Sequence, residues 1–86
     1  MHELSLIRDL LRKIEQIAAE QQASRVVAVG VRIGALAHIS ADHFREHFVD
    51  GVRGTLADGA RLDIETGTDT GEPQAQSIVL TRIDVQ

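Results

Sequence analysis

The sequence contains no cysteine, tryptophan or tyrosine, and its 86 residues include a single proline, Pro73. Without cysteine there are no disulfides, thiolate metal ligands or cysteine nucleophiles, so any metal must be held by nitrogen and oxygen donors. The only aromatic residues are Phe44 and Phe48, which means that the core is built mainly from Val, Ile, Leu and Ala. The chain is long enough for one small domain, whose core is marginal without a partner or a second copy.

Positive charge and long apolar runs are also scarce. The net charge is −4 at pH 7 and no basic patch is visible, which argues against a nucleic-acid partner because phosphate contacts need Lys and Arg. No apolar run is long enough to span a membrane, and charges interrupt the first twelve residues, so no signal peptide is indicated. We therefore expect a cytoplasmic protein that binds neither nucleic acid nor membrane.

The first half of the chain predicts a helix, a strand and a second helix. Apolar residues recur at three- and four-residue steps from about Glu3 to Gln22, which predicts an amphipathic helix. Residues 25–33 are rich in β-branched side chains and predict a strand. Regular alternation would place Val27, Val29, Val31 and Ile33 on one face of it, and Val26, Ala28, Gly30 and Arg32 on the other. Gly30 is expected to mark a bulge or a close backbone approach.

The second half begins with a helix over residues 41–53, for which Ser40 is a suitable N-cap and Gly54 a left-handed terminator. Asp58-Gly59 predicts a turn before a strand at residues 61–65. Residues 66–76 lack apolar periodicity and predict an exposed loop. Residues 77–85 predict a third strand, with Ile78 and Leu80 on the face opposite to Ile83 and Val85.

The order α-β-α-β-β indicates an α+β fold with two layers, a small three-stranded mixed sheet and two helices on one face. A strand–helix–strand unit favours a parallel pair with a right-handed crossover, and the last strand can add antiparallel. Nothing in the chain remains to cover the other face of the sheet. An uncovered apolar strip marks a contact surface for a partner or a second copy of the chain, and its predicted residues are Val26, Ala28, Ile78 and Leu80.

The first three residues, Met1, His2 and Glu3, offer ligands for a metal ion. The α-amine, the amide nitrogen of His2 and its imidazole can close small chelate rings in one plane, with Glu3 as a further donor. Flat, nitrogen-rich coordination suits Ni(II) or Cu(II) better than Zn(II), which prefers a tetrahedral site. A frayed terminus with a solvated histidine is the alternative explanation of the same residues.

Three more histidines lie near the second predicted helix. His43 and His47 are four residues apart, a spacing that can place two imidazoles on one metal. They border the Phe44 and Phe48 stripe and form no HExxH motif, so a solvated surface pair is the favoured explanation. His38, in the preceding loop, is interpreted as a surface residue unless that loop lies beside the amino terminus. No catalytic motif is present, and we expect no enzyme.

Four segments resemble the HypA/HybF nickel metallochaperones: residues 1–6, 31–36, 54–64 and 83–85. The resemblance covers residues 1 to about 65 and resumes near residue 77. It implies the same α-β-α-β-β topology and delivery of Ni(II) to a [NiFe] hydrogenase or urease precursor, with a nickel-handling GTPase as partner.

The resemblance also implies that the amino group of Met1, the His2 side chain and the backbone of Glu3 bind nickel. In some relatives an acidic residue near the start of the second helix assists. No residue of this chain matches that position cleanly, and His38 and Asp42 are the two candidates for the additional ligand.

The chain departs from the family pattern between the last two strands. Family members insert a zinc-binding domain with two CxxC pairs there, whereas this chain has residues 66–76 and no cysteine. We therefore expect one nickel-binding domain over residues 1–86 and no structural zinc. Three explanations remain open: a naturally truncated nickel carrier, an engineered deletion of the zinc module, or a non-metal paralogue that docks on a larger complex as an adaptor or structural subunit, through its open sheet face.

Overall fold

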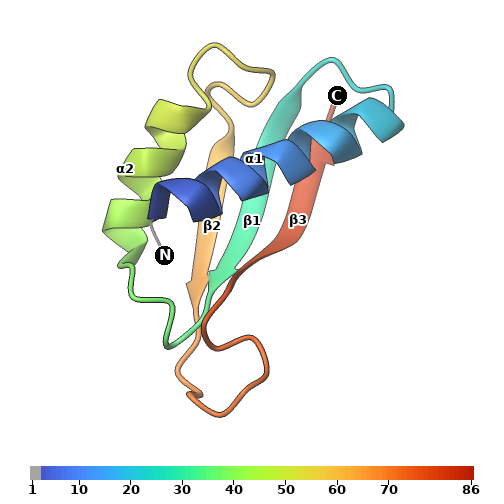
Figure 1. Cartoon of the computed structure of the whole chain (residues 1–86). Coiled ribbons are helices and arrows are strands. Elements are labelled where there is room, and N and C mark those ends of the chain that lie inside the picture. Colours follow the sequence, from blue (N-terminus) through green and yellow to red (C-terminus); the bar gives the residue numbers. More distant parts are fainter. Residues whose placement is uncertain (1–2) are drawn as a thin grey trace.

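The computed structural model describes the backbone of residues 3–86 and the side chains of residues 5–86 (Figure 1). Its elements are α1 (Glu3–Glu20), β1 (Val26–Ile33), α2 (Ala41–Gly51), β2 (Arg61–Thr66) and β3 (Ile78–Val85). The predicted α+β order is confirmed, and each element ends within about two residues of its predicted boundary. Among the described residues, no helix combines the length and apolarity needed to cross a bilayer.

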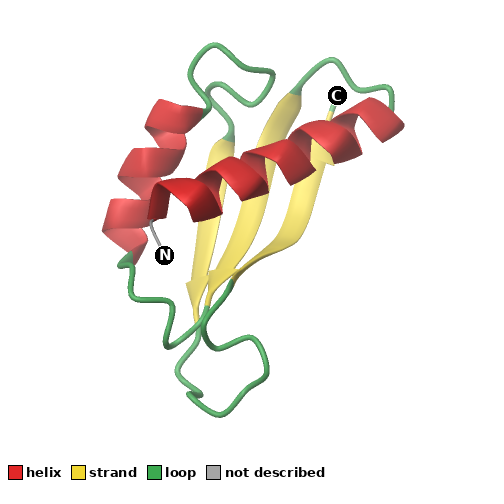
Figure 2. Cartoon of the chain, in the orientation of Figure 1, coloured by secondary structure: helices red, strands yellow, loops and turns green. Residues whose placement is uncertain are grey.

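The sheet has the strand order β2-β1-β3, so β1 is the central strand. β1 pairs in parallel with β2 and antiparallel with β3, as predicted. Figure 2 shows both helices on one side of the sheet, with α1 crossing the strands obliquely and α2 running beside β2. The helix connection between the parallel strands and the loop connection to β3 account for these directions.

The core lies between the helices and the sheet. One stripe of α1, including Ile7, Ile14 and Ala18, is buried against Phe44 and Phe48 of α2 and against the inner face of the strands. This stripe begins only one turn after Glu3. The start of α1 is therefore held in place by burial of its own apolar side chains.

The ends of α2 follow from local hydrogen bonding. The hydroxyl of Ser40 accepts a hydrogen bond from the backbone N–H of His43 at 3.1 Å, which confirms the predicted N-cap. The helix ends at Gly51, slightly earlier than predicted. Gly54 follows in the left-handed region with φ of +80°, the conformation expected of it.

Two β-bulges change the faces predicted for the strands. In the pairing of β1 with β3, Val26 lies opposite Val85 and Ala28 opposite Asp84, so Val27 is an extra residue. Nearer the other end, Gly30 lies opposite Arg82 and Val31 opposite Leu80, which makes Thr81 the extra residue of β3. One extra residue shifts the alternation and turns the side chains beyond it to the opposite face.

The predicted apolar strip on the open face is therefore wrong in its membership. Val26 is fully buried in the core. Ile78 and Leu80 pack against the core because they lie opposite Ile33 and Val31 on the helix-covered face. Of the four predicted contact residues, only Ala28 lies on the outer face, beside Arg61 and Asp84, and it too is buried, with 4% of its surface exposed.

The bulge in β3 also explains why a glycine stands at position 30. A Cβ atom at Gly30 would lie 3.0 Å from Oγ1 of Thr81 and 3.2 Å from Cβ of Arg82. The predicted close backbone approach is confirmed, and its cause is the extra residue on the neighbouring strand.

The connection between β2 and β3, residues 67–77, is a strap that packs on the loop after β1. It was predicted to be exposed, and most of it is, but Ala75 is buried. The backbone N–H of Leu36 donates to the carbonyl of Ala75 at 2.7 Å, and that of Gly34 to the carbonyl of Ser77 at 2.9 Å. A Cβ at Gly34 would collide with the Ala75 backbone, so this position requires glycine.

The bulge at Val27 predicts unequal costs for two neighbouring substitutions. Val26→Ala removes fully buried methyl groups and should lower the free energy of unfolding by about 2–3 kcal/mol. Val27→Ala, at the half-buried bulge residue, should cost less than about 1 kcal/mol. Urea denaturation of both variants measures the difference. Regular alternation would give the reverse ranking, and that result would contradict the bulge.

Candidate metal site

The predicted ligands at the amino terminus precede α1 directly. Met1 and His2 lie outside the described residues, and Glu3 is the first residue of α1. Figure 1 shows that α1 begins beside the middle turns of α2, and the two helices are in contact. The backbone at Glu3 therefore enters the fold at a fixed place, on the edge that α1 and α2 share.

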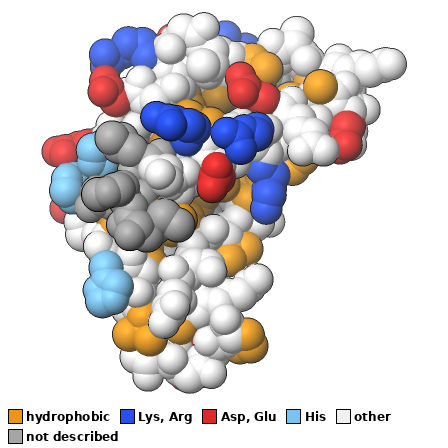
Figure 3. Space-filling view, viewed as in Figure 1, with side chains coloured by type: hydrophobic (Ala, Val, Ile, Leu, Met, Phe, Trp, Pro, Cys, Tyr) orange, Lys and Arg blue, Asp and Glu red, His pale blue; other side chains and the backbone are white. Residues whose placement is uncertain are grey.

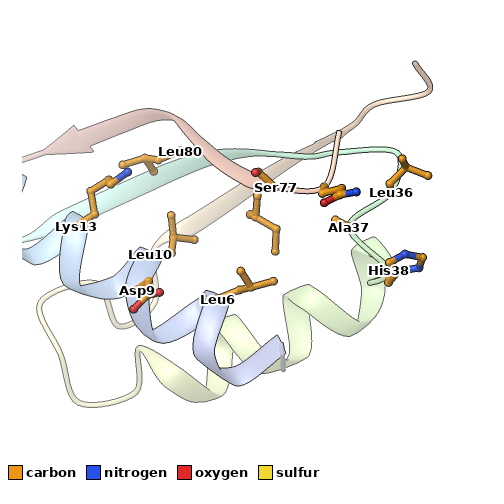
Figure 4. A pocket seen from close by; sticks show the side chains of 11 residues that line it. Leu6, Asp9, Leu10, Lys13, Leu36, Ala37, His38, Ser77 and Leu80 are labelled. Atoms are coloured by element: carbon orange, nitrogen blue, oxygen red, sulfur yellow. The ribbon is translucent and has the colours of Figure 1, made fainter. Parts of the chain in front are cut away.

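A groove of about 850 Å³ runs from this region along α1. Its walls come from α1, from the loop after β1, and from the strap and first half of β3. Figure 4 shows Leu6 and Leu10 of α1 directed toward it, with Lys13 and Leu80 at one end and His38 at the other, beside α2. The groove has an apolar floor and charged groups at its rim, since Lys13 and Asp9 are exposed while Leu10 is buried.

His38 is held in this position by an unusual backbone conformation. Its φ is +60°, in the left-handed region that non-glycine residues seldom adopt. The surrounding loop is fixed by a hydrogen bond from Ala37 N–H to the Gly34 carbonyl and by the strap, which pairs with Leu36. Strained conformations of this kind persist where the surrounding structure imposes them. As a result, His38 lies in the same groove as Leu6, in the first turns of α1.

Asp42, the other candidate for an additional ligand, lies elsewhere. It is exposed in the first turn of α2 and lines a separate hollow formed by α2 alone, together with Arg45, Glu46 and Asp50. The structure thus places His38, and not Asp42, in the groove beside the start of α1.

His43 and His47 lie on successive turns of α2, and their ring centroids are 4.9 Å apart. His43 is exposed and His47 half-buried, while Phe44 and Phe48, the residues directly after them, are fully buried. Figure 3 shows the histidine side chains of this face gathered along one edge of the molecule, with acidic side chains next to them. Within residues 5–86, no three His, Asp or Glu side chains converge as a ready-made metal site.

The outer face of the sheet is charged, because the bulges turn the apolar side chains of β3 inward. Nη2 of Arg61 lies 3.1 Å from the Asp63 carboxylate, and Nη1 of Arg82 lies 3.9 Å from the same group. Nη2 of Arg82 also approaches Asp84 to 2.6 Å. These residues come from the two outer strands and bridge Gly30 of the central strand, which lies opposite both Asp63 and Arg82.

At the other end of this face, Arg32 joins the strap to the sheet. It donates to Glu65 of β2 at 2.9 Å and to Glu72 of the strap at 3.5 Å. Sequence reasoning missed these ion pairs, although opposite charges at alternate positions of neighbouring strands were a visible signal.

The Arg82–Asp84 pair on the outer face shifts the pKa of both of its groups. The Arg82 side chain donates a hydrogen bond to Asp84, which lowers the pKa of that carboxyl below its ordinary value, and the charge of Arg61 acts in the same direction. The same bond raises the pKa of Arg82. Both groups are exposed, so water screens the pair and its effect on stability is small.

Comparison with known proteins identifies the family. The model of the family described as "Hydrogenase/urease nickel incorporation, metallochaperone, hypA" matches residues 1–72. The hydrogenase maturation factor HypA of Methylocella silvestris is 43% identical over 65 residues, which is 76% of this chain and 58% of the relative. HypA of Archaeoglobus fulgidus is 38% identical over 64 residues, 74% of this chain and 58% of the relative. The chain thus matches well under two thirds of the length of these relatives.

Two solved structures support the fold. The Ni metallochaperone HypA from Helicobacter pylori superimposes with a TM-score of 0.81 at 18% identity, covering 99% of this chain and 97% of that one. A second HypA structure gives a TM-score of 0.77 at 19% identity, covering all of this chain and 97% of the other. The matched family consists of metallochaperones and maturation factors, which confirms the expectation that the chain is not an enzyme.

The Arg82–Asp84 contact predicts a measurable change in titration. Arg82→Gln removes the charged donor, so the pKa of Asp84 should rise toward its ordinary value. The stabilisation from this carboxylate is present above the ordinary pKa and is lost as pH falls through the lowered one. Carboxyl chemical shifts followed by NMR measure this titration. Arg12→Gln, which breaks an exposed ion pair with Asp9 on α1, should leave the Asp84 titration unchanged.

Proposed function

The chain belongs to the HypA family, and from that premise we propose that it binds Ni(II) at its amino terminus and delivers the ion to a hydrogenase or urease precursor. The observation that carries the proposal is the family match from residue 1 onward, over a chain whose first helix begins at Glu3. The description of that family names nickel incorporation, and the chain supplies nitrogen donors before this helix.

The ligand set we propose consists of the amine of Met1, the amide nitrogen and imidazole of His2, and Glu3. These groups are adjacent in sequence, so their chelate rings are small and need no distant residue to close. Nitrogen ligands of this kind favour Ni(II) in a planar arrangement. Each donor must lose its proton to bind, so binding releases protons and weakens as pH falls.

Delivery follows from the position of the site at the end of a packed helix. The buried stripe of α1, from Ile7 onward, keeps the terminus attached to the domain while the ion passes to another protein. We propose that an incoming ligand displaces the terminal donors one by one, so that the carrier releases nickel without unfolding. The recipient precursor and a nickel-handling GTPase in the cytoplasm are the partners that the family assignment favours.

We propose His38 as the additional ligand, in preference to Asp42. His38 shares a groove with Leu6 of α1 and is fixed there by the strap, whereas Asp42 lines a hollow on α2 alone. A neutral imidazole also suits a nitrogen-rich nickel site better than a carboxylate does.

We further propose that residues 67–77 close the domain in place of a zinc module. Two strap hydrogen bonds join this connection to the loop after β1, and the Arg32–Glu72 ion pair joins it to β1 itself, without cysteine ligands. The competing function, an adaptor docking through an apolar open sheet face, loses its main support. The outer face carries paired charges, and Ile78 and Leu80 lie on the other side.

Nickel binding should depend on a free and native amino terminus. Protein that begins at Met1 should bind one Ni(II) in calorimetry and develop the visible absorption band of square-planar nickel. His2→Gln should abolish the band, because an amide replaces the imidazole ligand. A Gly-Ser extension before Met1 should do the same by removing the amine from the chelate.

One control variant completes this experiment. Arg82→Gln lies on the far face of the sheet and should bind nickel like the unmodified chain. The extension has two residues because a single one would move histidine to the third position, where a new planar chelate can form. If native protein shows no planar band, the delivery proposal is wrong.

Substitution of each residue should show which of the two candidates is the additional ligand. His38→Ala should weaken nickel binding by the native chain, because it removes an imidazole from the groove beside α1. Asp42→Ala should leave the affinity unchanged. Competition with a coloured nickel chelator measures both variants side by side. An effect of Asp42→Ala larger than that of His38→Ala would reverse the assignment.

A further inference from the structure

A pair of imidazoles on α2 has the geometry of a bidentate metal ligand. The ring centroids of His43 and His47 are 4.9 Å apart, with the planes tilted by 35°. Two imidazoles that bind one ion at about 2.0–2.1 Å place their centroids roughly 4.5 Å apart at a right angle and roughly 5.2 Å apart at a tetrahedral angle. The observed separation lies between these values, so the spacing of the two rings is compatible with both binding one ion.

The helix under this pair is rigid. Phe44 and Phe48, which are fully buried with ring centroids 6.1 Å apart, each follow one of the two histidines and fix α2 against the core. The N-cap hydrogen bond from His43 N–H to Ser40 fixes the first turn as well. A ligand pair on such a helix is preorganised, since metal binding has to order only two side chains.

The charges around the pair favour a cation. Asp42, Glu46 and Asp50 lie on the same helix, and acidic side chains adjoin the histidines in Figure 3. The two arginines of this region are engaged elsewhere: Arg45 donates to the Leu62 carbonyl at 3.1 Å, and Arg53 pairs with Asp50 at 3.0 Å. An acidic helix surface with its cations paired raises the local concentration of divalent ions.

We propose that His43 and His47 form a second nickel site, weaker than the terminal one and on the same edge of the molecule. α1 begins beside the middle turns of α2, so the pair lies close to the place where the chain enters the fold (Figure 1). Binding replaces two water molecules of the hydrated ion by two neutral imidazoles and leaves the remaining positions to water. Binding by the pair stands on its own geometry, whereas its role as a holding site for nickel in transit rests on the proposed function.

The coordination of the two sites differs in a way that spectroscopy detects. Nickel in a planar nitrogen chelate is diamagnetic, while a hydrated ion held by two imidazoles is octahedral and paramagnetic. A paramagnetic ion broadens the NMR signals of residues near it. The two sites can therefore be followed separately in one protein.

The test uses full-length protein that carries His2→Gln and the Gly-Ser extension, so that the terminal chelate is absent. Adding Ni(II) at pH 8 should selectively broaden the amide signals of residues 41–51 and saturate near one equivalent. His47→Gln should remove this selective broadening, and so should His43→Gln. Arg82→Gln, on the far face of the sheet and outside both proposed sites, is the control and should keep it. The dispersion of the remaining signals shows that each variant is folded.

Three results would overturn the proposal: no selective broadening on α2, broadening that survives His47→Gln, or equal loss with Arg82→Gln. The outcome is independent of the terminal site, which is measured by the planar absorption band of the native chain. Broadening on α2 without that band would support the helix pair while refuting terminal delivery. The band without broadening would leave delivery intact and remove the second site.

Discussion

Burial of one apolar stripe of α1 is the constraint on which the rest of the structure depends. Full burial of a residue such as Ile14 contributes about 1.5–3 kcal/mol, and the stripe repeats this contact along the helix. A domain with only two aromatic residues has few other sources of apolar contact. The stripe holds α1 to both α2 and the sheet, and it thereby determines where the amino terminus enters the fold. The backbone at Glu3, where α1 begins, gains a defined position from this packing.

The central strand separates two chemically different surfaces. Toward the helices, β1 presents Val26, Val29 and Val31 to the core. Toward the outside, its Ala28 and Gly30 leave room for arginine and aspartate side chains of the outer strands, which pair above them. The central strand has small residues on this face, and the outer strands have long charged ones. The charged side chains form ion pairs with one another. On the helix side, a groove along α1 includes the apolar side chains of Leu6 and Leu10.

The metal ligands that we propose therefore belong to one edge of the molecule. The terminal donors precede α1, His38 lies in the groove beside it, and the histidine pair is on α2. The histidines of this proposed set are nitrogen donors, and a chain without cysteine offers no thiolate. A planar chelate and an open pair of imidazoles would bind the same ion with different strength and geometry, which suits the proposed role of a metal carrier. The strap contributes by fixing the loop that carries His38.

The sequence by itself determined the element order, the mixed sheet, the N-cap at Ser40 and the donors at the amino terminus, because these depend on local periodicity and on residue type. It also determined the family, from segments spread over most of the chain. Which side chains of β1 and β3 face the core was decided only by the tertiary structure. Bulges at Val27 and Thr81 arise from the pairing of distant segments, and no local pattern reports which residue is left without a partner. For the same reason, only the fold shows that His38 and Leu6 share a groove, that Asp42 does not, and that Val26 belongs to the core.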